Sequence, residues 1–343
     1  MSSVLIIGPD HSANLEGSYS RSFERLGWSV QRWDPLSALH CAVRGGRLGR
    51  LFTTYVHVEP WLRLANLRLI EFAGSLKPDL ILVIGTEGLR PGTLAQLKAL
   101  LPHTLAYCLF PDTPHNLDLD RILCLPLFDR VLTVSPGWID AFSKLGAKEV
   151  CYLPPAADPE LHSPVIPKSS AAAKHEVAFV GNWRREREEL LEQLLDFDLG
   201  LWGSHYWKTR PRAGSKLPSR WHGRPLFGAE FAEACAQNRI LLNIIDGVGW
   251  PGPNMRVFEQ PACRAFSLVT RTPAILDLFT EGEDVECFAS VEEARDKIRF
   301  YLKNELARQR VAARSYETVI HGGHTYVDRA GQIITWAEQD AHT

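Results

Sequence analysis

The chain has 343 residues, of which 45% are hydrophobic and 23% charged, and its formal net charge is −2. This length predicts two packed domains, and the nearly neutral charge argues against a polyanionic partner such as nucleic acid. Seven cysteines without CxxC pairs indicate a reduced, cytoplasmic protein without structural zinc. The opening run MSSVLIIG is too short for a membrane span, so no transmembrane segment is expected there.

Short apolar runs predict the strands of a first α/β domain over residues 1–162. They are Val4–Ile7, Ser29–Trp33, Asp79–Gly85, Thr104–Phe110 and Arg130–Ser135. Continuous apolar strands separated by helical stretches are typical of a parallel sheet that is covered on both faces. The carboxyl ends of such strands lie at one edge of the sheet, where ligands bind.

A stretch rich in Pro, Ser and Ala predicts a linker over residues 163–175. A second α/β series follows over residues 176–322. Its expected strands are Glu176–Gly181, Leu199–Gly203, Ile240–Ile245 and Phe266–Thr270. Residues 323–343 have a helical pattern and are expected to cross back to the N-terminal domain. The fold class predicted is therefore α/β, with two Rossmann-like parallel-sheet domains facing a central cleft.

The most informative segment, Gly249–Thr270, is a Gly/Pro loop followed by a predicted helix from about Asn254 and then by a strand. The N–H groups and the partial positive charge at a helix start suit a diphosphate. Arg256 can add a charge-assisted contact to phosphate, and Glu259 can accept two hydrogen bonds from a ribose diol. Asn254 would either cap the helix or touch the sugar. On spacing alone, a surface helix with an Arg/Glu pair is an equally good interpretation.

The run NMRVFEQPAC at residues 254–263, with residues 273–282 and 287–302 after it, resembles the CgeB-type glycosyltransferases. The C-terminal domain of that family is the "glycosyl transferases group 1" module, and the resemblance covers most of residues 176–330. It implies a GT-B fold in which the C-terminal half binds a nucleotide-sugar and the N-terminal half binds the acceptor. The donor-binding residues it implies are Gly181, Asn182, Arg187, Gly203, Asn254, Arg256 and Glu259.

Two positions depart from the pattern of the family and its superfamily. Pro251 stands where a glutamate normally contacts the donor sugar, so that contact is missing or is made by another group such as Asp246. Arg264 stands in place of a glycine, which limits how closely the backbone there can approach a ligand.

Candidate acceptor-side residues follow two of the predicted strands. Asp112 and His115, in the run FPDTPHN, resemble the D-x-P segment of the family, and either one can take the proton from an acceptor hydroxyl in an inverting transfer. An equally good interpretation of Asp112 is a turn residue that caps the next helix. In a retaining transfer the leaving phosphate takes the proton, and Asp112 only orients the acceptor. His11, Ser18 and Tyr19, after the first strand, are further acceptor-side candidates.

No metal and no resident cofactor are expected. The D-x-D runs at residues 118–120 and 196–198 fall in leucine-rich stretches and are interpreted as solvated helix faces. Residues 8–17 lack the spacing of a dinucleotide fingerprint, which argues against nicotinamide or flavin. The expected partners are a UDP-, GDP- or dTDP-linked sugar and an acceptor that is a glycan, a protein or a small molecule.

Basic residues within 42–50 and 61–68 indicate at most a weak peripheral contact with a membrane. Two alternatives to glycosyl transfer stay open on the sequence. One is a nucleotide-sugar epimerase on the same scaffold, and the other is a non-catalytic module that binds nucleotide-sugars.

Overall fold

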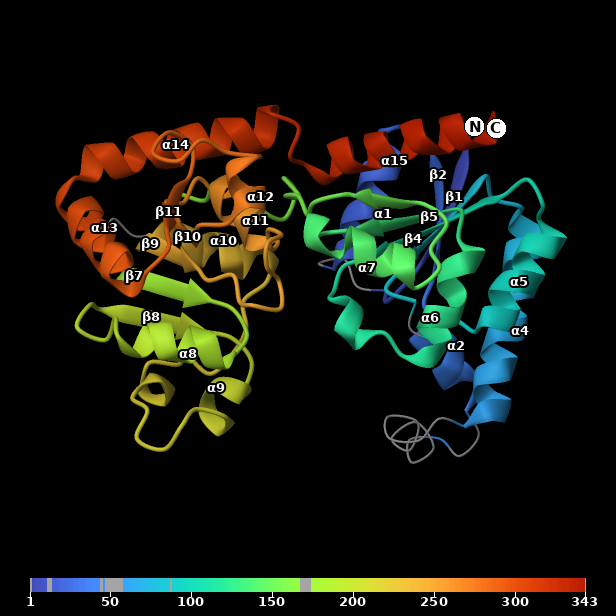
Figure 1. The fold of residues 1–343 in the computed structure, drawn as a ribbon, viewed down its shortest axis with the longest axis horizontal. Helices are drawn as coiled ribbons and strands as arrows, with labels where there is room; N and C mark the ends of the chain where they lie inside the picture. Colours follow the sequence, from blue (N-terminus) through green and yellow to red (C-terminus); the bar gives the residue numbers. More distant parts are fainter. Residues whose placement is uncertain are drawn as a thin grey trace. The chain divides into compact units, whose positions relative to one another are not determined.

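The computed structural model describes residues 2–10, 14–43, 46, 58–86, 88–166 and 174–342. The chain forms two compact units (Figure 1): residues 1–153 together with 327–343 make the first, and residues 154–326 make the second. Each unit contains one fully parallel sheet, so the predicted α/β class is confirmed.

The sheet of the first unit has six strands in the order β2-β1-β3-β4-β5-β6. Their bounds are β1 Ser3–Ile7, β2 Ser29–Trp33, β3 Leu80–Ile84, β4 Leu105–Phe110, β5 Arg130–Thr133 and β6 Val150–Tyr152. The chain adds β2 on one side of β1 and β3 on the other, so the strand order reverses between β1 and β3. The three-residue strand β6 was not predicted because it is too short to carry an apolar run.

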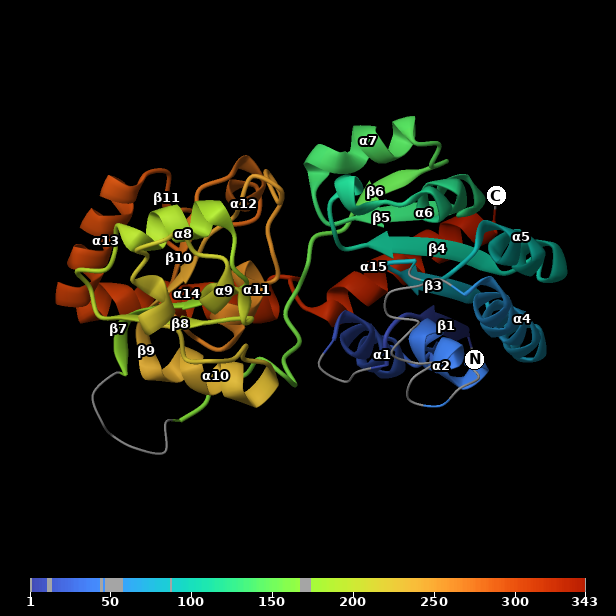
Figure 2. The same ribbon diagram turned by 90° about the horizontal axis from the view of Figure 1, so that it is seen from below.

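Helices cover this sheet, and α4 and α5 lie side by side in Figures 1 and 2. Helix α4 buries Leu62, Ala65, Leu69 and Ala73, a spacing that puts one apolar stripe on the sheet. It ends at Lys77, whose left-handed conformation stops the helix. The helices of this unit are α1 Leu15–Arg25, α2 Pro35–Ala42, α4 Glu59–Leu76, α5 Pro91–Leu100, α6 Leu119–Cys124, α7 Ile139–Lys144 and α15 Tyr326–Ala341.

Helix α15 is held on the first unit by a half-buried ion pair. The guanidinium of Arg130, in β5, donates to Asp340 at 2.8 Å and 3.3 Å, and Tyr107 donates to the same carboxylate. Burial opposes the charge on Asp340, but hydrogen bonds from Arg130 and Tyr107 hold the pKa of Asp340 below its usual range. The ring of Trp336 lies under the same guanidinium, at 5.3 Å. These contacts tie the last helix to the central strands β4 and β5.

The sheet of the second unit has five strands in the order β11-β10-β9-β7-β8. Their bounds are β7 His175–Val180, β8 Leu199–Trp202, β9 Asn238–Asn243, β10 Ser267–Thr270 and β11 Glu286–Phe288. The chain adds β8 on one side of β7 and β9 on the other, so the order reverses between β7 and β9. The short strand β11 was not predicted.

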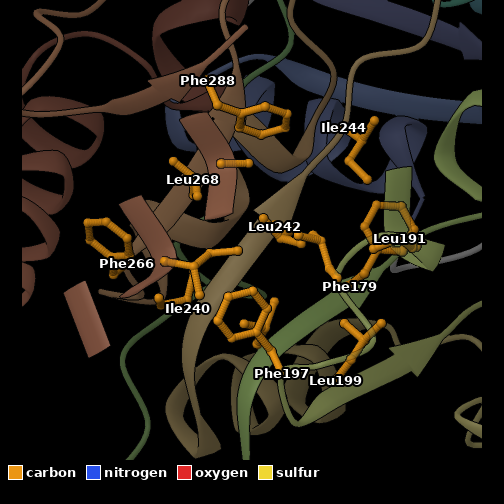
Figure 3. Close-up of a cluster of buried hydrophobic side chains, with 14 of the residues drawn as sticks. Phe179, Leu191, Phe197, Leu199, Ile240, Leu242, Ile244, Phe266, Leu268 and Phe288 are labelled. Carbon is orange, nitrogen blue, oxygen red and sulfur yellow. The ribbon is translucent and has the colours of Figure 1, made fainter. Parts of the chain in front are cut away.

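Phe179, Leu199, Leu242 and Leu268 project from successive strands of this sheet into a core that Leu191 of helix α8 completes (Figure 3). The helices of the second unit are α8 Arg185–Glu192, α9 Tyr206–Thr209, α10 Gly228–Gln237, α11 Arg256–Ala262, α12 Pro273–Leu276, α13 Val291–Lys303 and α14 Glu305–His321.

The boundary between the units falls after Leu153, earlier than the predicted linker at 163–175. Ala157 is fully buried in the second unit and forms a parallel bridge with Thr325. Its N–H donates to the carbonyl of His324 at 3.0 Å, and its carbonyl accepts from Tyr326 at 2.9 Å. These bonds hold the segment before residue 163 in the second unit, which composition alone does not reveal. Residues 167–173 of the predicted linker lie outside the described residues.

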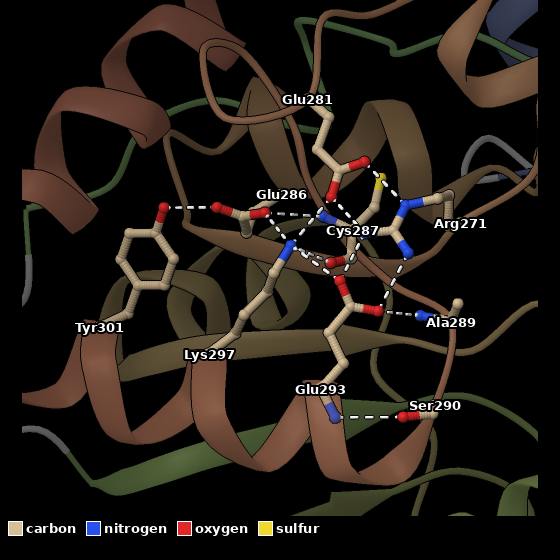
Figure 4. A network of polar contacts seen from close by, with 9 residues as sticks. All are labelled: Arg271, Glu281, Glu286, Cys287, Ala289, Ser290, Glu293, Lys297 and Tyr301. Atoms are coloured by element: carbon tan, nitrogen blue, oxygen red, sulfur yellow. Dashed lines mark hydrogen bonds and ion pairs between the residues drawn. The ribbon is translucent and has the colours of Figure 1, made fainter.

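A network of charges ties β10, β11 and α13 together in the second unit (Figure 4). Arg271 donates to Glu281 at 2.8 Å and to Glu293 at 2.9 Å, and Lys297 donates to Glu281 at 2.9 Å. Hydrogen bonds from Arg271 lower the pKa of both Glu281 and Glu293 to about 2. At neutral pH this network stabilises the edge of the sheet that is formed by β11.

Candidate functional site

The candidate site of the second unit lies at the carboxyl edge of its sheet, where the strand order reverses. Residues 181–184 follow β7 there, and residues 244–246 follow the neighbouring strand β9. Open parallel sheets bind ligands at this position because the loops on either side diverge. Helix α8 begins directly after the first loop, and no side chain caps its N-terminus. Its first N–H groups are therefore oriented to receive an anion.

Arg187 joins the two loops across the reversal point. Its Nε donates to the carbonyl of Ile244 at 3.2 Å, its Nη1 donates to the carbonyl of Asn182 at 2.9 Å, and its Nη2 lies 3.2 Å from Asp246. Burial lowers the pKa of this guanidinium, and the Asp246 carboxylate opposes that shift. Arg187 therefore holds the loops together, and an incoming phosphate has to compete with Asp246 for it.

Gly181 and Gly203 lie in close backbone contact at the ends of β7 and β8. A Cβ at Gly203 would stand 2.1 Å from the carbonyl oxygen of Gly181 and 2.8 Å from the ring of Trp207. That indole donates to the same carbonyl at 2.8 Å. Neither position has room for a side chain, since a Cβ at Gly181 would lie 2.8 Å from Phe179. Both predicted glycines thus shape the loop that precedes α8.

Asn254 pairs with Asn243, the last residue of β9. Each amide nitrogen donates to the oxygen of the other side chain, at 2.8 Å and 2.9 Å. The helix begins at Arg256 instead of Asn254, and its first turn carries no side-chain cap. Of the two roles left open for Asn254, the helix cap is therefore not the one that its contacts show, because its amide pairs with Asn243. The pair instead anchors the start of α11 to the end of β9.

Glu259 is almost fully buried on α11, with one neighbour on each carboxylate oxygen. Arg256 donates to Oε2, and Nε2 of His162 lies 3.6 Å from Oε1. The Arg256 guanidinium stacks over the ring of Phe231 at 3.9 Å. His162 was not predicted as a site residue, because it precedes the strands of the second sheet and belongs to no sequence motif.

The two groups of predicted donor residues therefore contact one short segment, residues 243–246. Arg187 reaches it from the first turn of α8, and Asn254 reaches it from the loop just before α11. Two helix N-termini without side-chain caps and two partly buried guanidinium groups make this edge suitable for an anion. Glu259 adds a hydrogen-bond acceptor for hydroxyl groups.

Pro251 and Arg264, the two positions that depart from the family pattern, lie in different surroundings. Pro251 lies in the loop after β9, and Asp246 in the same loop accepts from the N–H of Gly249 at 3.1 Å besides pairing with Arg187. Arg264 adopts a φ of 59°, the left-handed region that favours glycine. An arginine thus stands in a backbone conformation that glycine adopts more readily, and its guanidinium lies 5.4 Å from the centre of the Tyr316 ring.

In the first unit, Asp112 and His115 are both exposed in the turn after β4. Asp112 accepts from the N–H of Thr113 at 2.7 Å and from the amide of Asn116 at 2.6 Å. The hydroxyl of Thr113 lies 3.0 Å from Nδ1 of His115. These contacts place Asp112 in the turn, but the residue that caps the following short 3-10 helix (Pro114–Asn116) is Thr113, whose hydroxyl accepts from the N–H of His115. Both Asp112 and His115 keep solvent-facing surface.

The structure buries Ser18 and Tyr19, which were predicted to face the acceptor. Ser18 is 4% exposed and Tyr19 is 1% exposed, both on α1. Burial raises the pKa of Tyr19, and the nearby charge of Arg329 on α15 opposes that shift. Both side chains therefore face the interior of the first unit and not solvent. His11 lies outside the described residues.

Thr86 lies at the carboxyl edge of the sheet in the first unit and was not among the predicted site residues. It follows β3 with a φ of 65°, a strained conformation for a β-branched side chain. Its buried hydroxyl has no hydrogen-bond partner among the described residues, and the same holds for Ser135 after β5. Strain of this kind gathers at functional sites. The sequence places Ser135 at the end of a predicted strand, whereas no local sequence signal identifies Thr86.

The D-x-D run at residues 118–120 lies at the start of a helix: Asp118 caps α6 by accepting from the N–H of Arg121, and Asp120 is in the first turn of that helix. The run at residues 196–198 lies in the turn before β8 and not in a helix, contrary to prediction, and Asp196 pairs with Arg295. Within the described ranges, no group of three His, Cys, Asp or Glu side chains is placed to hold a metal. In the same part of the chain, no helix is long and apolar enough to cross a membrane.

Residues 184–335 match the family described as "Glycosyl transferase-like". No curated protein matches the sequence. Among solved structures, the chain is similar to sucrose-phosphate synthase from Thermosynechococcus elongatus, with 12% identity, a TM-score of 0.65 and 99% of each chain covered. It is also similar to a glycosyltransferase from Rickettsia africae ESF-5, with 12% identity, a TM-score of 0.65 and 98% of each chain covered. A third similar structure is HepE from Anabaena in complex with UDP-glucose, with 14% identity, a TM-score of 0.64, and 99% of this chain and 100% of that one covered.

These similarities confirm the predicted fold class. The chain has the GT-B fold, with two parallel-sheet α/β domains like those of the glycosyltransferases named above. The match to the glycosyl transferase-like family spans residues 184–335, which include Arg187, Arg256 and Glu259.

Proposed function

We propose that this protein is a glycosyltransferase that moves a sugar from a nucleotide-sugar to a hydroxyl-type acceptor without a metal. The observation that carries the proposal is that Arg187, in the first turn of α8, and Asn254, just before α11, both contact residues 243–246, at the point where the strand order reverses. The similarity to a structure that contains UDP-glucose supports a nucleotide-sugar ligand. Because its sequence resembles the CgeB-type glycosyltransferases, we propose that the protein belongs to that family.

In this proposal Glu259 accepts hydrogen bonds from the ribose, and the diphosphate lies against the N-termini of α8 and α11. Arg256 and Arg187 stabilise the negative charge that develops as the bond between the anomeric carbon and the phosphate oxygen breaks. These groups supply positive charge from the protein itself, which is why no metal is proposed. The donor is UDP-, GDP- or dTDP-linked; a UDP- or GDP-linked donor offers Glu259 both ribose hydroxyls, whereas the deoxyribose of a dTDP-linked donor offers only one.

On the acceptor side, Asp112 and His115 are proposed as the groups that take the hydroxyl proton in an inverting reaction. An Asp112→Ala variant tests this role. A turnover that falls by two orders of magnitude or more, on the order of the 10²- to 10⁴-fold contribution of general bases, supports it. Unchanged turnover assigns Asp112 to the turn alone, and the hydroxyls of Thr86 and Ser135 then become the next candidates for contact with the acceptor.

The proposal is tested by titrating the protein with UDP, GDP and dTDP and with their glucose conjugates in a thermal-shift assay. A genuine donor at a hundredfold excess over its Kd stabilises the folded state by about 2.7 kcal/mol. The conjugate that binds is then incubated alone and with acceptors, and release of free sugar or glycoside is measured. Slow hydrolysis or transfer supports the proposal.

Binding without either product points to a non-catalytic module, and interconversion of sugar epimers points to an epimerase. Absence of binding by all the nucleotides contradicts the proposal. Glu259→Gln should weaken nucleotide binding by roughly 10- to 100-fold, since it removes a charged hydrogen-bond acceptor worth about 1.5–3 kcal/mol. Glu233→Gln, on the exposed face of α10, is the matched control and should bind like the wild type.

A further inference from the structure

A buried histidine from outside the glycosyl transferase-like segment stands beside the carboxylate of Glu259. Nε2 of His162 lies 3.6 Å from Oε1 of Glu259, and each of the two side chains is 9% exposed. His162 belongs to the stretch that leads into the second unit and precedes the matched residues 184–335. The family match therefore assigns it no role.

The imidazole of His162 is fixed by its own turn. The N–H of His162 donates to the carbonyl of Asp158 at 2.7 Å, and the N–H of Asp158 points to Nδ1 of the ring at 3.4 Å. The ring also packs edge-on against Phe231, with centroids 5.8 Å apart. Because a backbone N–H faces Nδ1, the hydrogen-bond network assigns the proton of the neutral ring to Nε2. That nitrogen is the one directed at Glu259.

Phe231 lies under both neighbours of the carboxylate. Its ring contacts both the imidazole of His162, edge-on at 5.8 Å, and the guanidinium of Arg256, at 3.9 Å. Glu259 is consequently held at one oxygen by Arg256 and approached at the other by His162. At 3.6 Å the imidazole is beyond hydrogen-bond length, so its contribution is electrostatic and directional. A carboxylate held in this way has few alternative rotamers.

We propose that His162 is a positioning residue that fixes the orientation in which Glu259 receives a ribose diol. This inference rests on the proposed function, because it requires a ribonucleotide at Glu259. It assigns to His162 an effect on recognition of the diol and none on the chemical step. The chain thus supplies part of its donor site from a segment that precedes the donor sheet.

The experiment compares the affinity of each variant for UDP and for 2′-deoxy-UDP by isothermal titration calorimetry, or for GDP and 2′-deoxy-GDP if GDP binds more tightly. The wild type is expected to prefer the ribonucleotide by about tenfold or more, because the deoxy analogue leaves the buried carboxylate short of one partner. His162→Leu should reduce this preference to less than about threefold. His162→Gln, whose amide can stand in for Nε2–H, should keep it, and His321→Leu on the exposed end of α14 is the control.

A histidine that only supports the fold gives a different result: its removal weakens both nucleotides equally and leaves their ratio intact. That outcome overturns the inference, as does a wild type that binds both nucleotides equally well. If His162→Leu fails to fold, His162→Asn takes its place, since its shorter amide cannot reach Glu259. A double variant with Glu259→Gln should show no further loss of preference beyond either single change. Failure of the wild type to bind any nucleotide contradicts the proposed function itself and is recognised before the variants are compared.

Discussion

Replacement of Gly203 by alanine tests the close approach of the β7 and β8 loops. The added methyl would lie 2.1 Å from the carbonyl oxygen of Gly181 and 2.8 Å from the ring of Trp207. The first neighbour is backbone and the second is a fully buried indole, so neither can move without disturbing the core. The methyl must therefore push the Gly181 carbonyl away from the indole N–H that donates to it at 2.8 Å.

The expected cost has two parts. Overpacking of a well-filled site costs about 1–3 kcal/mol. Loss of one partly buried hydrogen bond adds about 1 kcal/mol. Gly203→Ala should therefore destabilise the second unit by about 2–4 kcal/mol, and it should also weaken nucleotide binding because Gly181 opens the loop before α8.

Urea denaturation monitored by tryptophan fluorescence measures this effect. The m-value should be the same in the variant and the wild type, so that a shift of the midpoint reports a change in stability. The control is Gly247→Ala, in the loop after β9, where a Cβ would meet no atom within 4 Å. That change should alter stability by less than about 0.5 kcal/mol. Equal midpoints for the two variants would refute the reasoning, because they would mean that the backbone at Gly203 has room for a side chain.

Three further predictions concern other parts of the chain. Asp340→Ala should destabilise the first unit by about 2–4 kcal/mol, because it leaves the buried guanidinium of Arg130 without its main partner. Glu338→Ala, on the exposed face of the same helix, is the control and should cost less than about 0.5 kcal/mol; thermal unfolding measures both. Arg264→Gly should be more stable than Arg264→Ala by about 1 kcal/mol in urea, since glycine adopts the φ of 59° without strain, and equal stability would contradict this. Glu281 and Glu293 have folded-state pKa values of about 2 against an ordinary value of 4.5, so their stabilisation is complete above pH 4.5 and is lost as the pH falls towards 2. Because both are partly exposed, we expect about 1 kcal/mol from each, and replacing both by Gln should flatten the loss of stability in urea titrations between pH 5 and about 2.5.

The sequence by itself determined the two parallel sheets and most of their strands. Runs such as LILVI in β3 and ILL in β9 are apolar on both faces, and only a strand covered on both sides can bury such a run. The polar or glycine residue that follows each run marks the carboxyl edge. Glu259 and Arg187 were found because the family resemblance rests on short, contiguous motifs.

Only the tertiary structure decided which side chains meet. In the sequence, Asn254 could either cap a helix or contact the sugar, and the structure shows that its amide pairs with Asn243 at the end of β9. His162 and Glu259 lie far apart along the chain and are brought together by the turn at Asp158 and the packing against Phe231. Hydrophobic periodicity reports how each element is buried, whereas partnership between polar groups depends on where separate elements come to rest. The helices and strands could therefore be predicted from the sequence, whereas the contacts that build the candidate site could not.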